Sequence, residues 1–132
     1  MKIKIEKNKP ITLFIRVKGP KKSHEYKAVI DSGSLYSIIP LQDARDMGYE
    51  AYNHPDDPGF GVKVVNKSHV EEYNEIIIQE VILGELKITN MRAIACDLPK
   101  LSHLEATLGL SFLENFKTTI DYGKGYLTIE PR

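Results

Sequence analysis

The sequence has one cysteine and no tryptophan among its 132 residues. The single cysteine, Cys96, cannot form an internal disulfide, and it excludes the paired-cysteine motifs of zinc and redox sites. No apolar run approaches the roughly 18 residues that a membrane-spanning helix requires. The N-terminal segment MKIKIEKNKP also lacks the apolar stretch of a secretion signal. We therefore expect a cytoplasmic protein with no membrane partner, in which Cys96 is a small buried hydrophobic side chain.

The chain also has no excess of charge of one sign, because 18 Lys and Arg balance 18 Asp and Glu. Zero net charge removes the simplest argument for nucleic-acid binding, and we expect no nucleic-acid partner. The charges are unevenly distributed, since residues 1–27 carry nine basic and two acidic side chains. This excess indicates either a basic surface for an anionic partner or the solvated faces of strands and turns.

Spacings typical of metal, nucleotide and serine-hydrolase sites are missing as well. Ser32 and Ser34 lack a GxSxG elbow, and Gly59-Phe60-Gly61 lacks the third glycine of a nucleotide-binding loop. The histidines do not form a metal-binding spacing such as HxH or HExxH: His24, His54, His69 and His103. We expect no metal and no cofactor.

The periodicity that is present is two, which is typical of half-buried strands. Strands are expected around Ile3 and Ile5, over residues 11–17, and over residues 24–31 as the return strand of a hairpin. The return strand ends in the continuous apolar run Ala28-Val29-Ile30, which predicts burial on both faces.

The rest of the chain also consists mainly of short strand patterns. Residues 40–47 predict a helix that ends before Gly48, and residues 110–116 predict two helical turns. Further strands are expected at 62–65 and 69–73, as a hairpin standing away from the core, and at 76–83, 86–96, 118–121 and 126–129. About ten short strands predict one all-β domain over residues 1–132, folded as a small barrel.

A polar tetrapeptide, Asp31-Ser32-Gly33-Ser34, interrupts two apolar runs. A tight turn between buried strands places Asp31 near the core, where an ionised carboxylate needs hydrogen bonds. Gly33 lets backbone N–H groups approach the carboxylate, and the two serines add hydroxyl donors. Taken alone, Asp-Ser-Gly is also an ordinary turn tripeptide.

The run AVIDSGSLYSII resembles the active-site loop of the aspartic proteases, and the chain resembles their single-domain, retropepsin-like members found outside viruses. The segment ATLGLSFLENFKTTIDYGKGYLTIEP resembles the family's apolar-apolar-glycine element with its short helix and closing strands. The hairpin near residues 62–73 resembles the flap. The resemblance covers about residues 11–130, and it implies a small closed barrel of the acid-protease type with one or two short helices. The chain departs from the family at Leu35, at Thr107 and at the glycine-free tip 66–68.

The resemblance implies an aspartic endopeptidase in which two carboxylates share one proton around one water. Because the chain has a single Asp-Ser-Gly, catalysis by Asp31 requires a two-fold homodimer. Support of the active-site loop is implied for Ser32, Gly33, Ser34, Leu108 and Gly109. Flap contacts to a peptide or protein substrate are implied for Val65, Asn66, Lys67 and Ser68.

Several points stay open at the level of sequence. The hydroxyl of Ser34 either donates to Asp31 or only caps the turn. The alternating terminal strands, with Ile3, Ile5, Leu127 and Ile129, are expected to pair between subunits, as terminal strands of this family commonly do. The alternative function is a catalytically inactive module of the same fold that binds peptides or dimerises. A third hypothesis is an unrelated small barrel that binds an anion through its basic N-terminal face.

Overall fold

The computed structural model describes residues 1–49, 62–65, 70–96 and 106–132. The elements in this part of the chain are β1 (Lys2–Lys4), β2 (Thr12–Lys18), β3 (Ser23–Ile30), β4 (Ser37–Pro40), α1 (Leu41–Asp46), β5 (Val62–Val65), β6 (Val70–Leu83), β7 (Leu86–Cys96), β8 (Ala106–Leu108), α2 (Leu110–Leu113), β9 (Phe116–Asp121) and β10 (Tyr126–Pro131). The predicted all-β class with two short helices is confirmed.

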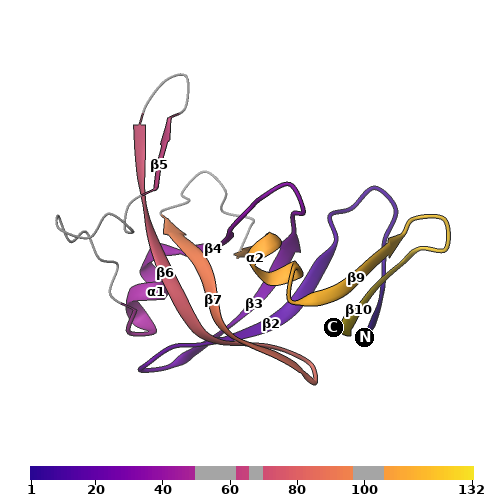
Figure 1. Ribbon diagram of the computed structural model, residues 1–132, viewed down its shortest axis with the longest axis horizontal. Coiled ribbons are helices and arrows are strands. Elements are labelled where there is room, and N and C mark those ends of the chain that lie inside the picture. Colours follow the sequence, from indigo (N-terminus) through magenta and orange to yellow (C-terminus); the bar gives the residue numbers. More distant parts are fainter. Residues whose placement is uncertain (50–61, 66–69, 97–105) are drawn as a thin grey trace.

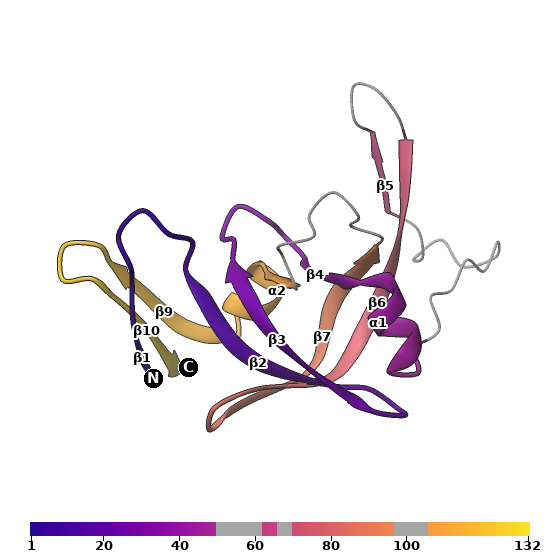
Figure 2. The same cartoon turned by 180° about the vertical axis from the view of Figure 1, so that it is seen from behind.

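Six strands form a closed barrel in the order β2-β3-β8-β4-β7-β6, because β6 returns to pair with β2. The closing contact is short and joins Arg16–Lys18 to Glu80–Ile82. The predicted closed barrel is thus confirmed. One long strand, β6, replaces the two strands expected at 69–73 and 76–83. Its first part pairs with β5 and stands away from the barrel, as the sequence predicts (Figures 1 and 2).

The barrel core follows the period-two pattern of the strands. Leu13, Ile15 and Val17 of β2 are buried, and the residues between them are exposed. The run at the end of β3 departs from the prediction, because Ala28 is buried but Val29 and Ile30 are only half-buried. This end of β3 is therefore partly accessible to solvent, although Ile30 still packs against the core. Cys96 is buried, as expected.

A second sheet, in the order β1-β10-β9, joins the two ends of the chain (Figure 1). Met1 and Ile129 exchange backbone hydrogen bonds of 2.7 and 2.8 Å, and Leu127 and Ile129 are fully buried in the core. The alternating terminal strands therefore pair within one chain, where Leu127 and Ile129 are buried and Ile3 and Ile5 are half-buried. Their burial does not require exchange of terminal strands between subunits.

Helix α1 is positioned by the aromatic residue that follows it. Pro40 ends β4 in an extended conformation, the helix begins at Leu41, and Gly48 breaks it with a φ of 93°. The hydroxyl of Tyr49 then donates to the Lys18 carbonyl at 2.5 Å and accepts the Gln79 N–H at 2.8 Å. One side chain thus connects the end of α1 to both strands of the closing contact.

Burial raises the pKa of the Tyr49 hydroxyl, and the Gln79 N–H partly offsets this by favouring the phenolate. The raised pKa means that the folded protein favours the neutral hydroxyl. The contribution of this raised pKa to stability is fully present below the pKa of the unfolded state, about 10. It is lost as the pH rises through the higher pKa of the folded state. The Tyr49 bridge is therefore intact at neutral pH.

We predict that Tyr49→Phe lowers the free energy of unfolding by about 1–3 kcal/mol, because it leaves a carbonyl and an N–H without their partner. Tyr122→Phe is the matched control, since Tyr122 is 75% exposed and should change stability little. Urea unfolding of both variants measures the difference. Equal stability of the two variants would show that the bridge contributes nothing.

Candidate active site

The loop that carries Asp31 begins where β3 ends. Its first residue is tied to β8, because the Asp31 N–H donates to the Leu108 carbonyl at 2.9 Å. The Ser34 N–H then donates to the Asp31 carbonyl at 3.2 Å, which closes a four-residue turn. Strand β8 lies between β3 and β4, parallel to β3 and antiparallel to β4. The two segments that carry the sequence motifs, 31–34 and 107–109, therefore meet side by side.

The Asp31 carboxylate is oriented by a backbone donor. The Gly33 N–H donates to Oδ1 of Asp31 at 3.0 Å. A Cβ at Gly33 would lie only 3.3 Å from the same oxygen, so this close approach suits glycine. The expectation that Asp31 lies near the core is wrong, because residues 31–33 are exposed. The turn projects beyond the last paired residue of β3, and the carboxylate faces solvent.

The Ser34 hydroxyl does not contact the Asp31 carboxylate. Its Oγ donates to the Tyr36 carbonyl at 2.8 Å. Of the two alternatives left open by the sequence, donation to Asp31 is therefore wrong and capping of the turn is correct. A carbonyl two residues along the chain is within easy reach of a serine hydroxyl. The Ser34 hydroxyl thus stabilises the end of the loop, and the Gly33 N–H donates to the Asp31 carboxylate.

A pair of serines, of which Ser37 is buried, connects the loop to the chain beyond β8. Ser37 is fully buried, and its Oγ lies 2.9 Å from Oγ of Ser111 and accepts the Gly109 N–H at 3.2 Å. The Ser37 N–H also donates to Oγ of Ser111 at 2.9 Å. The sequence analysis assigned neither serine to the site. The available signal was a serine inside the apolar run Tyr36–Ile39, since a buried hydroxyl needs partners.

The start of α2 is bonded directly to the loop. The Leu110 N–H donates to the Ser34 carbonyl at 2.8 Å, and the Ser111 N–H donates to the Leu35 carbonyl at 3.0 Å. Gly109 makes this approach possible, because a Cβ there would lie 2.6 Å from the Ser34 oxygen and closer still to the Tyr36 oxygen. The glycine of the apolar-apolar-glycine element therefore sets the distance between α2 and the loop.

The remaining candidate residues are placed only in part. Leu108 and Gly109 contact the loop as described, and Ser32 is exposed beside Asp31. Val65 ends β5 and pairs with Val70. The flap residues Asn66, Lys67 and Ser68 lie outside the described residues.

The described part of the chain contains neither a cluster of metal ligands nor a membrane-spanning helix. In residues 1–49, 62–65, 70–96 and 106–132, no three His, Cys, Asp or Glu side chains gather as metal ligands would. Within the same ranges, neither helix has the length and hydropathy needed to cross a membrane. Of the four histidines, His24 is described, whereas His54, His69 and His103 are not.

The fold is similar to solved structures of retropepsin-like proteins. A retropepsin-like aspartic protease from Rickettsia conorii matches with a TM-score of 0.66 and 19% identity, over 98% of this chain and 88% of that chain. The retroviral protease-like domain of Ddi1 from Leishmania major matches with a TM-score of 0.57 and 20% identity, over 93% of this chain and 90% of that chain. No protein-family model and no curated protein sequence matches. The chain therefore has the retropepsin-like fold that its two motifs predict.

We predict that Gly109→Ala lowers the free energy of unfolding by about 1–3 kcal/mol, the usual cost of forcing an atom into a packed site. The added methyl would push α2 away from the Ser34 and Tyr36 carbonyls. Gly123→Ala is the matched control, because a Cβ there meets its nearest atom at 3.4 Å, an ordinary contact. Thermal unfolding distinguishes them, and a Gly109 variant as stable as the control would contradict this packing argument.

Proposed function

We propose that the protein is an aspartic endopeptidase that acts as a homodimer and hydrolyses peptide bonds with a water held between Asp31 and its symmetry mate. The observation that supports this most is the placement of Asp31. An exposed carboxylate, oriented by the Gly33 N–H, lies directly after β3 in a retropepsin-like barrel. The fixed turn supports the proposal because it holds the carboxylate in one position for catalysis.

The proposed chemistry needs two carboxylates that hold one proton between them. The ionised carboxylate takes a proton from the water while the water oxygen bonds to the peptide carbonyl carbon. The protonated carboxyl gives its proton to the carbonyl oxygen. When the C–N bond breaks, the leaving nitrogen takes a proton from the pair. A hydroxyl of the tetrahedral intermediate returns a proton to the pair as the new carbonyl forms, so one shared proton remains. One chain supplies only one Asp31, so a second copy completes the site.

We predict that Asp31→Asn abolishes turnover and leaves the fold intact, because Asn is nearly isosteric but cannot accept the proton. Loss of general acid–base catalysis should lower the rate by a factor of roughly 10² to 10⁴. Asp46→Asn is the control, since Asp46 lies on the surface of α1 and accepts a hydrogen bond from the neighbouring Gln42. Cleavage of a random peptide library by the purified proteins measures the difference.

The same library decides between catalysis and the inactive alternative. Undiminished cleavage by the Asp31 variant would overturn the assignment of the catalytic residue. A parent protein that binds library peptides but cleaves none would favour a peptide-binding module of the same fold.

The free edge of β9 is our proposed contact between the two copies. Met1 and Ile129 exchange hydrogen bonds, so the backbone groups of Ile129 face β1. Those of the next residue, Thr128, therefore face Thr119 of β9. The backbone groups of Thr118 therefore point away from β10. Within the described residues no strand pairs with that edge. The hydroxyl oxygen of Thr118 is also buried there without a hydrogen-bond partner in this part of the chain.

The charges on β9 fit a two-fold contact. Lys117 and Asp121 are both exposed and lie two residues either side of Thr119. If two β9 strands pair antiparallel about Thr119, Lys117 lies opposite Asp121 of the partner subunit, and the reverse pair forms by symmetry. Opposite charges facing each other across neighbouring strands stabilise the pairing. The edge is therefore complementary to itself.

We predict that Lys117→Glu weakens the dimer by about tenfold, because two attractive pairs of roughly 0.2–1 kcal/mol each become repulsive. Lys124→Glu changes the same charge in the β9–β10 turn, beyond the proposed contact, and should have little effect. Sedimentation equilibrium measures the dissociation constants, and specific activity should fall on dilution in parallel. A monomer that cleaves peptides at any concentration would contradict the requirement for a dimer.

A further inference from the structure

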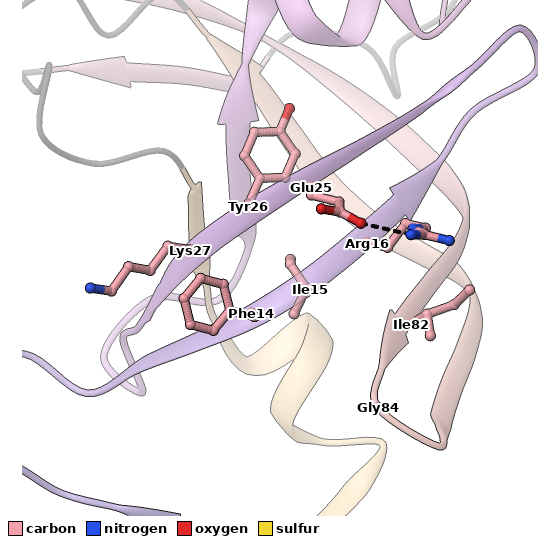
Figure 3. Close-up of a pocket in the computed structure, with 8 residues that line it drawn as sticks. All are labelled: Phe14, Ile15, Arg16, Glu25, Tyr26, Lys27, Ile82 and Gly84. Atoms are coloured by element: carbon pink, nitrogen blue, oxygen red, sulfur yellow. Dashed lines mark hydrogen bonds and ion pairs between the residues drawn. The ribbon is translucent and has the colours of Figure 1, made fainter.

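A hollow on the outer face of the barrel lies apart from the residues placed at the active site. It has a volume of about 530 Å³ and lies over β2 and β3, beside the turn between β6 and β7 (Figure 3). Phe14 and Ile82 give it apolar walls, and Arg16 and Lys27 add positive charge. No step of the proposed peptide hydrolysis uses these four side chains.

The most exposed apolar side chain of this hollow is Phe14, with an exposed fraction of 77%. Phe14 lies directly opposite Lys27 in the pairing of β2 with β3, and Arg16 lies opposite Glu25. The Arg16 guanidinium forms an ion pair with Glu25 at 2.7 Å, drawn in Figure 3. The hollow therefore combines an aromatic surface with two cations and one carboxylate, a net positive charge.

The edge of β2 beside Phe14 can accept a further strand. The Ile30 N–H donates to the Ile11 carbonyl, so the backbone groups of Ile11 face β3. In an antiparallel pair this direction alternates along the strand, so the backbone groups of Leu13 and Ile15 also face β3. The N–H and carbonyl of Phe14 therefore point away from β3. Strand β6 pairs with β2 at Arg16–Lys18 and ends at Leu83, and the turn at Gly84 lines the same hollow as Phe14. In the described chain no strand pairs with β2 at Phe14 on that side.

We propose that this hollow binds an extended peptide segment that carries an acidic residue next to an apolar one. The peptide backbone pairs with the outward N–H and carbonyl of Phe14, as in strand addition to a sheet edge. Its apolar side chain packs on the Phe14 ring, and its carboxylate lies between Arg16 and Lys27.

Charge complementarity identifies the acidic partner. A second hollow, of about 320 Å³, shares Lys27 and is also lined by Lys4, Lys9 and Glu6. Positive charge thus continues along the surface on the other side of Lys27. Together the two hollows carry four cations and two carboxylates, so their net positive charge attracts an acidic peptide and repels a basic one.

The test uses the Asp31→Asn protein, so that a bound peptide is not cleaved and the result does not depend on activity. The probe is a fluorescein-labelled ten-residue peptide of alternating glutamate and valine, followed by fluorescence anisotropy. We expect measurable binding that weakens with added salt, and at least tenfold weaker binding after Phe14→Ser or Lys27→Glu. Matched controls are Ile77→Ser, at an exposed apolar residue of β6, and Lys124→Glu, and both should bind like the parent.

Four results would overturn the proposal. The first is no binding at millimolar peptide, and the second is equal binding of a lysine–valine peptide. The third is unchanged binding by both Phe14→Ser and Lys27→Glu. The fourth is a change in self-association of the Phe14→Ser protein in the absence of peptide. The last result would identify a second copy of the chain as the occupant. Circular dichroism checks that the variants fold. Because the Phe14 side chain is exposed, its replacement should not disturb the core. Because cleavage is absent from the assay, failure of this proposal and failure of the proposed activity are distinguishable.

Discussion

The insertion of β8 between β3 and β4 is the constraint on which the rest of the site depends. Strand β8 has three residues, too few to be stable without neighbours on both sides. It brings the Leu108 carbonyl to the Asp31 N–H and positions Gly109 against the Ser34 and Tyr36 carbonyls. A larger residue at position 109 would separate the loop from α2. The orientation of the carboxylate thus depends on a contact more than seventy residues away in sequence.

Buried polar groups, as well as apolar packing, hold this junction together. Ser37 is fully buried and satisfied by Ser111 and Gly109, so the pair of hydroxyls links β4 to the start of α2. A buried network of this kind costs stability if any member is removed, because the remaining groups lose their partners. It also permits one geometry only. Such a network suits a loop that must present one carboxylate in a fixed position.

The sequence predicted the barrel well because most of its strands bury alternate residues, as Leu13, Ile15 and Val17 do. The turn at Gly84-Glu85 and the strand from Leu86 to Cys96 were predicted to the residue, since turn chemistry and periodicity agree there. Solvent exposure of Asp31 and the bond from Ser34 to Tyr36 were not predictable in the same way. Both depend on where paired strands end in three dimensions. The pairing of Ser37 with Ser111 likewise joins positions 74 residues apart, and no local pattern connects them.

Within the described residues, the terminal sheet has two unpaired edges, β1 and β9, and their charges distinguish them. On β1 the exposed side chains that flank Ile3 are Lys2 and Lys4, so antiparallel pairing of two β1 strands about Ile3 would place lysine opposite lysine. Like charges facing each other across strands oppose pairing, and edge lysines commonly protect strands in this way. The outer face of β9 instead carries one cation and one carboxylate, spaced so that a two-fold axis at Thr119 matches them. Among the edges of this sheet, electrostatics therefore blocks β1 and leaves β9 available to a second copy.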